Sequence, residues 1–407
     1  MMTFWEPSRV EKMKRDNMVA IAARLMSDFA IRTNLSPSAK RPQRYLWTDA
    51  FAVCNFLELH ARTDERRFRR CATDMIEQVH RVLGRYRDDD KRGGWISGLE
   101  ERAGAHHPTA GGLRIGKSLR ERSVNEAFDE ILEWDRDGQY FHYLTKWMHA
   151  LCQSAYATNN FEYALWAAEL GEAAFNGFAQ RSRSGHVVGV YWKMSTDLSR
   201  PLIPATGSHD ALDGLITFQG AQNALEMSPI KCVGADLSSA VEALSRLCQH
   251  KEWSTTDPLG LGGLLFDAGR ICQLISKEGH GDVRLLESVL EACRNGLTGL
   301  LASHYLDRPT SYRLAFRELG LAIGLQALPH IADVVQKGKD SLRNSRALVD
   351  SLLPYESLSV DIVSAWLPRA QSPDEAWQAH RDINDVMLAT ALAPEMFLSV
   401  GQRISEA

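Results

Sequence analysis

The stretch from Thr48 to Leu59 reads TDAFAVCNFLEL, and apolar side chains cover nearly every side of the helix that it predicts. Such a helix is stable only when it is buried all round. The next helix, expected over residues 63–83, is amphipathic, because four arginines between residues 66 and 70 make one face polar. A buried helix followed by an amphipathic one is therefore the repeating unit that we expect.

The same alternation continues along the chain. Buried helices are predicted over 137–156, from 209, from 257, over 308–328 and over 374–391, and amphipathic helices over 7–31, 159–179, 235–250, 282–303 and 331–352. About twelve helices then form six hairpins, and their uneven spacing favours a closed ring over an open repeat array. The sequence predicts an all-α (α/α)6 toroid, one domain over 1–407, with rim inserts at 84–133 and 181–208.

Composition excludes several functional classes. The net charge is -4 and acidic and basic residues are interspersed, so neither nucleic acid nor membrane is an expected partner. Seven cysteines form no CxxC pair and read as reduced core residues. No signal peptide and no apolar run of about 18 residues is present, which predicts a cytoplasmic protein. Nothing in the sequence suggests a nucleotide cofactor, so none is expected, and the oligomeric state stays open.

A local motif carries a family resemblance. Tyr45–Phe51 reads YLWTDAF and resembles the Trp-x-Asp-x-x-aromatic motif of rhamnogalacturonyl hydrolases, with the aromatic Phe51 one residue early. Over nearly its whole length the chain resembles the six-hairpin glycosidase superfamily, which also includes unsaturated glucuronyl hydrolases and, in a related toroid, N-acylglucosamine 2-epimerases. The resemblance implies the toroid fold, a saccharide substrate and a general acid/base role for Asp49.

In such a toroid, the first turns of the inner helices and the loops that enter them line a funnel. Acids and aromatic rings suit sugar hydroxyls and sugar faces, although helix capping alone also places acids there. The long first insert adds a candidate stacking platform, and residues 187–194 of the second predict a short β-strand. The candidate binding residues are Trp47, Trp95, Glu133, Gln139, Tyr140, His142, His209, Asp213, Arg308, Tyr312 and Arg313.

Glycoside hydrolysis is the first functional hypothesis, because it needs one protonated carboxyl and one carboxylate. Asp135 or Asp137 is the candidate acid, since nearby Glu133 should raise one pKa, and Asp49 or Asp210 is the candidate partner. The alternative role of each acid is a helix cap or an ion pair with an arginine.

Two further hypotheses stay open. His142 and His209 are a candidate pair of bases for a sugar epimerase or isomerase, one removing and one returning a proton. Their structural alternative is burial against a neighbouring hydroxyl or carbonyl. A toroid that binds a glycan or a protein without catalysis is the third hypothesis.

Two other kinds of site are disfavoured. His106 and His107 are adjacent and no HExxH spacing occurs, so no metal site is predicted. The loop Gly111–Lys117 is rich in glycine but lacks the spacing of a phosphate loop. Arg308, Tyr312 and Arg313 are close enough on a helix to hold the carboxylate of an acidic sugar, or to form rim salt bridges.

Overall fold

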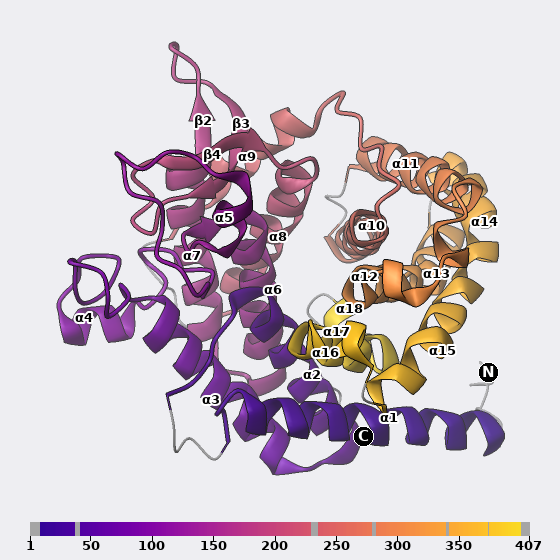
Figure 1. Ribbon diagram of the computed structural model, residues 1–407. Coiled ribbons are helices and arrows are strands. Elements are labelled where there is room, and N and C mark those ends of the chain that lie inside the picture. Colours follow the sequence, from indigo (N-terminus) through magenta and orange to yellow (C-terminus); the bar gives the residue numbers. More distant parts are fainter. Residues whose placement is uncertain are drawn as a thin grey trace.

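The computed structural model of the chain describes residues 9–36, 41–228, 235–278, 282–338, 342–372 and 374–399. Within these ranges, an inner layer of helices forms a ring in which each helix contacts the next, and the last contacts the first (Figure 1). This closed ring confirms the predicted all-α (α/α)6 toroid. The inner helices are α2 (Leu46–Thr63), α6 (Phe141–Thr158), α8 (Asp210–Glu226), α10 (Pro258–Glu278), α12 (Ala315–Leu325) and α17 (Arg381–Leu392).

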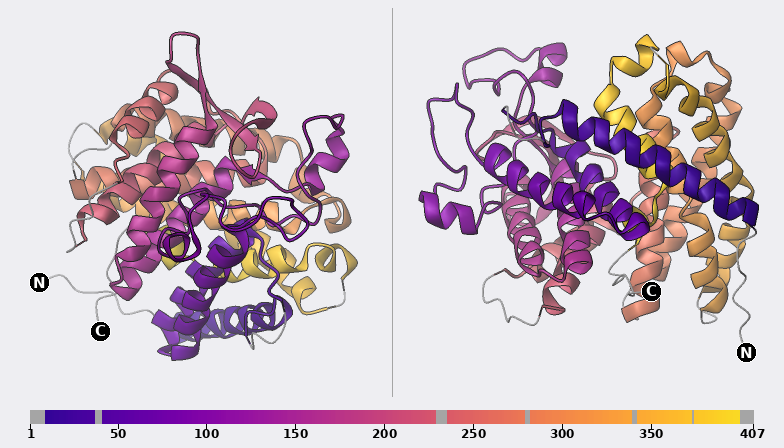
Figure 2. Two further views of the ribbon diagram at one scale, coloured as in Figure 1. Left: turned by 90° about the vertical axis from the view of Figure 1, so that its left-hand side faces the viewer. Right: turned by 90° about the horizontal axis from the view of Figure 1, so that it is seen from below.

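An outer layer of helices covers the ring. α1 (Arg9–Arg32) packs on both α17 and α2, and it therefore joins the two ends of the ring (Figure 2). Each remaining inner helix is covered by a helix that follows it in the chain. These outer helices are α3 (Arg66–Leu83), α7 (Glu162–Phe178), α9 (Ser238–Cys248) and α11 (Val283–Ala302), with α13 (Leu328–Lys337), α14 (Arg343–Leu352) and α15 (Leu358–Ala370) in the fifth hairpin.

Side-chain size decides how closely the inner helices pack. α2 is buried along 46–59, as its apolar sequence predicts, whereas α3 buries only the stripe that faces the ring. Between α10 and α12 the backbones touch, because a Cβ atom at Gly262 would clash with the carbonyl of Gly320, and one at Gly324 with that of Gly262. These glycines are required by a close approach of helices, not by a turn.

The fifth hairpin departs from the prediction. Residues 308–314 were expected to be helical, but η1 (Tyr305–Asp307) and η2 (Thr310–Tyr312) form short 3-10 turns there, and α12 begins only at Ala315. The predicted outer helix over 331–352 is also divided into α13 and α14, and a further turn, η4 (Leu353–Ser357), leads into α15. Arg313 has an extended backbone (φ -125°, ψ 152°), and its guanidinium donates to the carbonyls of Leu306 and Arg308, which holds the segment before Ala315 in turns.

A small antiparallel sheet lies at the end of the ring where the inner helices begin. β3 (Val187–Met194) is the predicted strand, and β2 (Ala179–Arg181), β4 (Pro201–Thr206) and β1 (Gln139–Tyr140) all pair with it. Because β1 takes up residues 139–140, α6 begins at Phe141 and not at the expected Asp137. The first insert holds the short helices α4 (Glu101–His106) and α5 (Glu130–Asp135).

The C-terminal segment closes the other end of the ring. After α16 (Glu375–Gln378) and α17, the short helix α18 (Glu395–Leu398) turns back against α2, α6 and α10. The ring of Phe397 stacks on Phe51 at 4.4 Å and on Phe266 at 4.5 Å between centroids. The backbone N–H of Met396 donates to buried Glu58 at 2.8 Å. The axis of the toroid is therefore filled at this end.

Two features of the composition can be placed in the fold. The thiols of the described cysteines are free, and all except half-buried Cys71 lie in the core, while Cys232 falls outside the described residues. Among the described residues, one apolar stretch, Ala315–Lys337, is long enough to cross a membrane, but 72% of the tested window is buried. The stretch spans α12 and α13, and its apolar side chains are explained by their packing in the helix ring.

Candidate functional site

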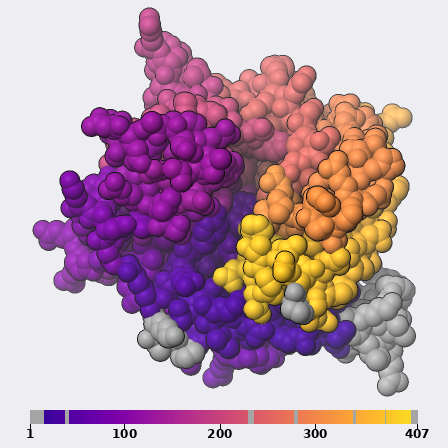
Figure 3. Space-filling view, viewed as in Figure 1, coloured from indigo at the N-terminus to yellow at the C-terminus, as the bar shows by residue number. Residues whose placement is uncertain are grey.

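The mouth of the ring is lined with aromatic side chains. The space-filling view shows this face hollowed near the centre of the ring, between the magenta and orange parts of the chain (Figure 3). Half-buried Trp192 and His142 lie parallel, with ring centroids 6.3 Å apart and planes 9° apart. Tyr140 lies 5.2 Å from Trp192, and Trp47 lies 6.0 Å from His142. Flat rings around a polar centre suit a sugar.

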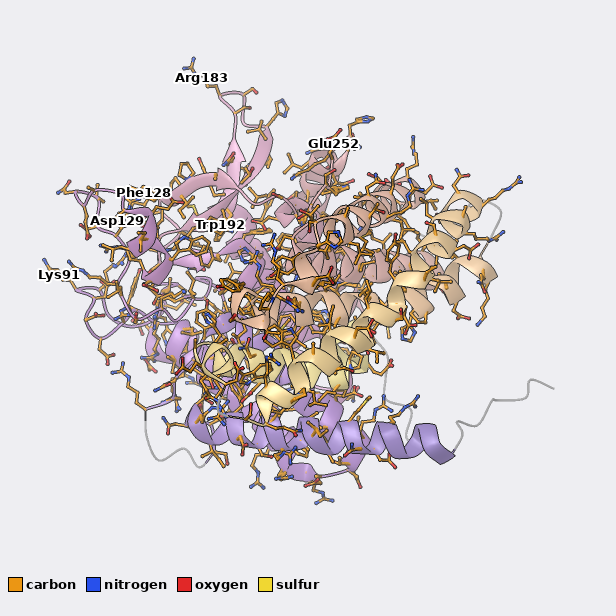
Figure 4. The ribbon with its side chains drawn as sticks, turned by 45° about the vertical axis from the view of Figure 1, so that its right-hand side comes forward. Lys91, Phe128, Asp129, Arg183, Trp192 and Glu252 are labelled. Carbon is orange, nitrogen blue, oxygen red and sulfur yellow. The ribbon has the colours of Figure 1, made fainter. Side chains whose placement is uncertain are left out.

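The sheet positions these rings. Tyr140 of β1 pairs with Lys193 of β3, so the neighbouring Trp192 reaches the first turn of α6. Figure 4 shows Trp192 on the part of the sheet nearer the ring and Arg183 at the projecting tip of the β2–β3 hairpin. Tyr45, just before α2, shares a hydrogen bond of 2.6 Å between hydroxyls with Tyr143 of α6. Residues from several elements thus meet around the start of α6.

His142 and Asp210 form the most exposed polar pair of this site. Nδ1 of His142 lies 3.8 Å from Oδ1 of Asp210, which is too long for a hydrogen bond. Nδ1 of His142 and Oδ2 of Asp210 are both buried and have no hydrogen-bond partner among the described residues. Buried polar atoms are rarely left unpaired, so this pair is suited to a polar ligand.

Burial sets the protonation of the pair. Burial, and then the negative charge of Asp213, raises the pKa of Asp210 to about 7. Burial, and then the positive charge of Lys146, lowers the pKa of His142 to about 4. At pH 6 the imidazole is therefore neutral and the carboxyl of Asp210 is largely protonated. One group can accept a proton while the other donates one.

Asp213 is held as a charged anchor one turn further along α8. Lys146 donates to Oδ1 of Asp213 at 2.7 Å, Thr145 donates to Oδ2, and Nη1 of Arg270 lies 3.6 Å from Oδ1. Burial alone would raise the pKa of Asp213, but Lys146 and Arg270 outweigh it and hold this pKa below its usual range. Asp213 thus stays ionised and acts on its neighbours through its charge.

Arg270 joins a second acid to the same group. Nη1 of Arg270 lies 3.5 Å from Asp267, and Nη1 and Nη2 both donate to Thr217 at 3.0 Å. Burial, and then the charge of Asp213, raises the pKa of Asp267 to about 7. We call the following six side chains the funnel cluster: His142, Lys146, Asp210, Asp213, Asp267 and Arg270.

The acids just before α6 are engaged differently. Glu133 binds Lys193 at 3.0 Å and Arg122 at 3.1 Å. Asp137 is fully buried, and it accepts from Arg114 and, at 3.0 Å, from the backbone N–H of Gly116. We call this second group of side chains the rim cluster: Arg114, Arg122, Glu133, Asp137 and Lys193. The exposed side chain of Asp135 belongs to neither cluster.

Three other candidate residues are buried and bind groups of the protein itself. Asp49 accepts from the N–H of Tyr45 at 2.9 Å and lies 3.6 Å from Arg44, and burial raises its pKa to about 6. Trp95 is 6% exposed and lies under the guanidinium of Arg85 at 4.4 Å, which leaves little surface for a sugar. Buried Gln139 binds three backbone groups, at Gly111, Leu113 and Thr196.

The remaining candidates are dispersed. His209 is half-buried beside Asp210, and its Nε2 lies 3.2 Å from the carbonyl of Trp253. Because α12 starts late, Arg308, Tyr312 and Arg313 do not share a helical turn. Tyr312 is 78% exposed, whereas Arg313 is bound bidentately by buried Glu318. The guanidinium of Arg313 thus binds an internal carboxylate and is not available to a substrate.

Sequence inspection missed Lys146, Asp267, Arg270 and Trp192. A usable signal was present for the first three, because each is a charge in the middle of a helix that is otherwise apolar, and such charges are rare unless they have a role. Trp192 carried no signal, since only strand pairing brings it to His142. Within the described ranges, no group of three His, Cys, Asp or Glu side chains is placed to hold a metal ion.

Comparison with known proteins gives few matches. No family model matches the chain, and no curated protein matches it. A D-mannose isomerase structure is 10% identical, with a TM-score of 0.46, over 86% of this chain and 87% of that one. A cellobiose 2-epimerase from Spirochaeta thermophila DSM 6192 is 13% identical, with a TM-score of 0.44, over 86% and 100%. At such identity, side chains cannot be matched between the proteins; the toroid expected from the superfamily resemblance is confirmed by the helix ring itself.

Proposed function

We propose that the chain is a carbohydrate-active enzyme that moves a proton within a small saccharide, as a sugar isomerase or epimerase. The observation that carries this proposal is the pair of His142 and Asp210, 3.8 Å apart, each with an unpaired buried atom beside a parallel tryptophan ring. General acid–base catalysis of proton transfer needs a neutral base next to a protonated acid. His209, the partner of His142 in the sequence hypothesis, is a neighbour of this pair.

The proposed step begins on the open-chain form of an aldose. His142 takes the proton from C2, the electron pair forms a C1–C2 double bond, and Asp210 donates its proton to O1, which gives an enediol. Return of the proton to C1, with the proton of O2 passing back to Asp210, gives the ketose. If the enediol first rotates about its C2–C3 bond and turns the other face of C2 to His142, return of the proton to C2, with the proton of O1 passing back to Asp210, gives the epimer. Both outcomes leave the two groups in their starting states.

The surroundings of the pair support a saccharide as substrate. Half-buried Trp192 offers a ring face at the mouth, and behind it the hydroxyl of buried Tyr140 has no hydrogen-bond partner among the described residues. Nε of Arg270, deeper in the site, also lacks a partner. Below them, Phe397 fills the axis, which favours a small substrate over a long chain threaded through the ring.

Hydrolysis of a glycosidic bond is the second candidate function. The observation in its favour is that Asp210 and Asp267, both with a pKa of about 7, accompany the ionised Asp213 in one cluster. A protonated carboxyl and a carboxylate are the pair that hydrolysis uses. Lys146 and Arg270 neutralise Asp213, however, and a neutralised carboxylate is a weak base. Proton transfer within the sugar is therefore our first proposal.

One experiment separates the hypotheses. Wild type and Asp210→Asn are incubated in D2O with a panel of aldoses, ketoses and reducing disaccharides, and separately with aryl glycosides and unsaturated uronides. We expect wild type to convert a free sugar into its isomer or epimer with solvent deuterium at C1 or C2. We also expect the rate to be highest between about pH 4 and 7, where His142 is neutral and Asp210 protonated.

The other outcomes each reject this proposal. Release of an aryl group without deuterium incorporation would establish hydrolysis instead. Binding of sugars, detected by tryptophan fluorescence, without turnover of any compound would identify a binding toroid. Activity that survives Asp210→Asn would remove Asp210 from the mechanism.

A further inference from the structure

A second, basic groove lies outside the funnel. It has a volume of about 970 Å³ and is formed by residues 41–44, the end of α3, residues 85–89 and the loop 114–118. Its lining includes only two acids, Asp88 and Asp89, so the groove is basic, whereas the chain as a whole has a net charge of -4. The basic side chains are Arg41, Arg44, Arg81, Arg85, Arg87, Arg114 and Lys117.

Two of these cations have no acidic partner within the described ranges. Five arginines are paired: Arg41 with Asp88, Arg44 with Asp49, Arg85 with Glu101, Arg87 with Asp89 and Arg114 with Asp137. The side-chain nitrogen atoms of exposed Arg81 and half-buried Lys117 make no hydrogen bond or ion pair with any described residue. Lys117 instead lies 5.4 Å from the ring of Tyr45. The groove thus keeps two positive charges.

Buried donors in the groove are also unsatisfied. The side chain of Arg44 is completely buried, and its Nε and Nη1 have no hydrogen-bond partner, while Nη2 donates to the carbonyl of Thr33 at 2.8 Å. Nε of Arg85 is buried without a partner as well. Leaving such donors unpaired is costly, and their positive charge adds to that of the groove.

In the glycine-rich loop Gly111–Lys117, the backbone N–H groups of Gly116 and Lys117 are not available to bind an anion in the groove. The backbone N–H groups of Gly116 and Lys117 point at Oδ1 of Asp137, at 3.0 and 3.4 Å. This part of the loop therefore cradles an internal carboxylate in the way that backbone nests cradle phosphates. Its N–H groups are used up, and an external anion would be held by the arginine and lysine side chains of the groove.

We propose that this groove binds the phosphate group of a small molecule, with Arg81 and Lys117 as its principal ligands. A phosphate ester carries about -1.5 to -2 charges at pH 7, which matches the two unpaired cations. Arginine forks also bind phosphate oxygens in pairs, so the partly exposed Arg85 can add directed contacts, and buried Arg44 adds positive charge beneath the groove. The proposal does not depend on the chemistry of the funnel cluster.

The test is calorimetric titration of the full chain at constant ionic strength. The probes are inorganic phosphate, a hexose 6-phosphate and the unphosphorylated hexose. The variants are Arg81→Ala/Lys117→Ala, the charge-keeping Lys117→Arg, and the control Arg183→Ala, which removes an exposed arginine from the tip of the β2–β3 hairpin (Figure 4).

We expect saturable binding of phosphate or of the hexose phosphate to wild type, Lys117→Arg and Arg183→Ala. The double variant should bind about tenfold more weakly or worse, since hydrogen bonds to a charged group are lost. Equal affinity for both phosphate probes would identify free phosphate as the ligand, and tighter binding of the hexose phosphate an organic phosphate. The variant Asp210→Asn should bind them as wild type does.

Two results would overturn the proposal. One is the absence of saturable binding by either phosphate compound to wild type. The other is unchanged affinity in the double variant, which would mean that the heat arises elsewhere. Arg81 and Lys117 make no internal ion pair, so circular dichroism should show the double variant folded; if it does not fold, Lys117→Gln alone must weaken binding.

Discussion

The funnel cluster and the rim cluster flank the start of α6 and contain the same kinds of residues, yet they are organised differently. In the rim cluster, Glu133 and Asp137 are each held by a buried or half-buried cation and by further hydrogen bonds. In the funnel cluster, Asp210 and His142 keep atoms without a partner among the described residues, whereas Asp213 is bound by Lys146, Thr145 and Arg270. Pairing, and not composition, therefore separates the acids to which we assign a structural role from those that we propose for chemistry.

The largest difference between substitutions in the funnel and substitutions in the rim should be seen in catalytic activity. Asp210→Asn removes the proposed proton donor, and kcat/KM should fall by about 10²- to 10⁴-fold. Its matched control is Asp129→Asn, because Asp129 caps α5 on the surface and asparagine caps a helix equally well. Steady-state kinetics on the substrate found in D2O measures both variants, and a loss in the control equal to that in Asp210→Asn would contradict the assignment.

The second difference concerns stability. Asp137→Asn leaves Arg114 buried without a counter-charge, so the free energy of unfolding should fall by about 3 kcal/mol. Asp210→Asn should cost much less, because Asp210 has no ion pair shorter than 3.8 Å and is largely protonated at pH 6. Urea denaturation at pH 6 compares the two variants. Equal losses would mean that both acids are structural.

A third comparison concerns two aromatic side chains of the rim. Trp192→Ala removes the ring parallel to His142, and KM should rise by about tenfold with a smaller change in kcat. Phe128→Ala is the control, since Phe128 is 55% exposed in the same rim but lies away from Trp192 in Figure 4. A fall in kcat with unchanged KM would instead indicate that Trp192 only orients His142.

The last comparison concerns the pH dependence of stability. Burial raises the pKa of Asp210 from 3.8 to about 7, so between these values the native state keeps a proton that the unfolded state releases. Stability contributed by this group is present below pH 3.8 and is lost as pH rises to about 7. Wild type should therefore lose stability relative to Asp210→Asn as pH rises from 4 to 7, because asparagine does not titrate. A difference that is constant over this range would contradict the raised pKa.

The fold was predictable because burial leaves a periodic trace in the sequence. The apolar run of Thr48–Leu59 and the polar face that follows it specify an inner and an outer helix, and repetition of this pair specifies the ring. The predicted strand over 187–194 agrees with β3. Helix starts were less predictable: Gln139–Tyr140 joins a sheet, and the extended backbone at Arg313 delays α12.

The site was only partly predictable. Tyr140, His142, Asp210 and Asp213 were selected from helix starts and do gather at the mouth, beside Trp47. The sequence could not distinguish them from Asp137, because the partner of Asp137 is Arg114, 23 positions away, and no local pattern encodes that contact.

The sequence by itself therefore determined the ring of helices and the end at which polar residues collect, because both follow from local periodicity and from helix starts. Tertiary structure alone decided which acid is neutralised and which stays available. Lys146 and Arg270 reach Asp213 from two other helices, and Trp192 reaches His142 from a strand. Protonation and pairing depend on distances of a few ångströms in a buried environment, and only the packing of the helices sets those distances.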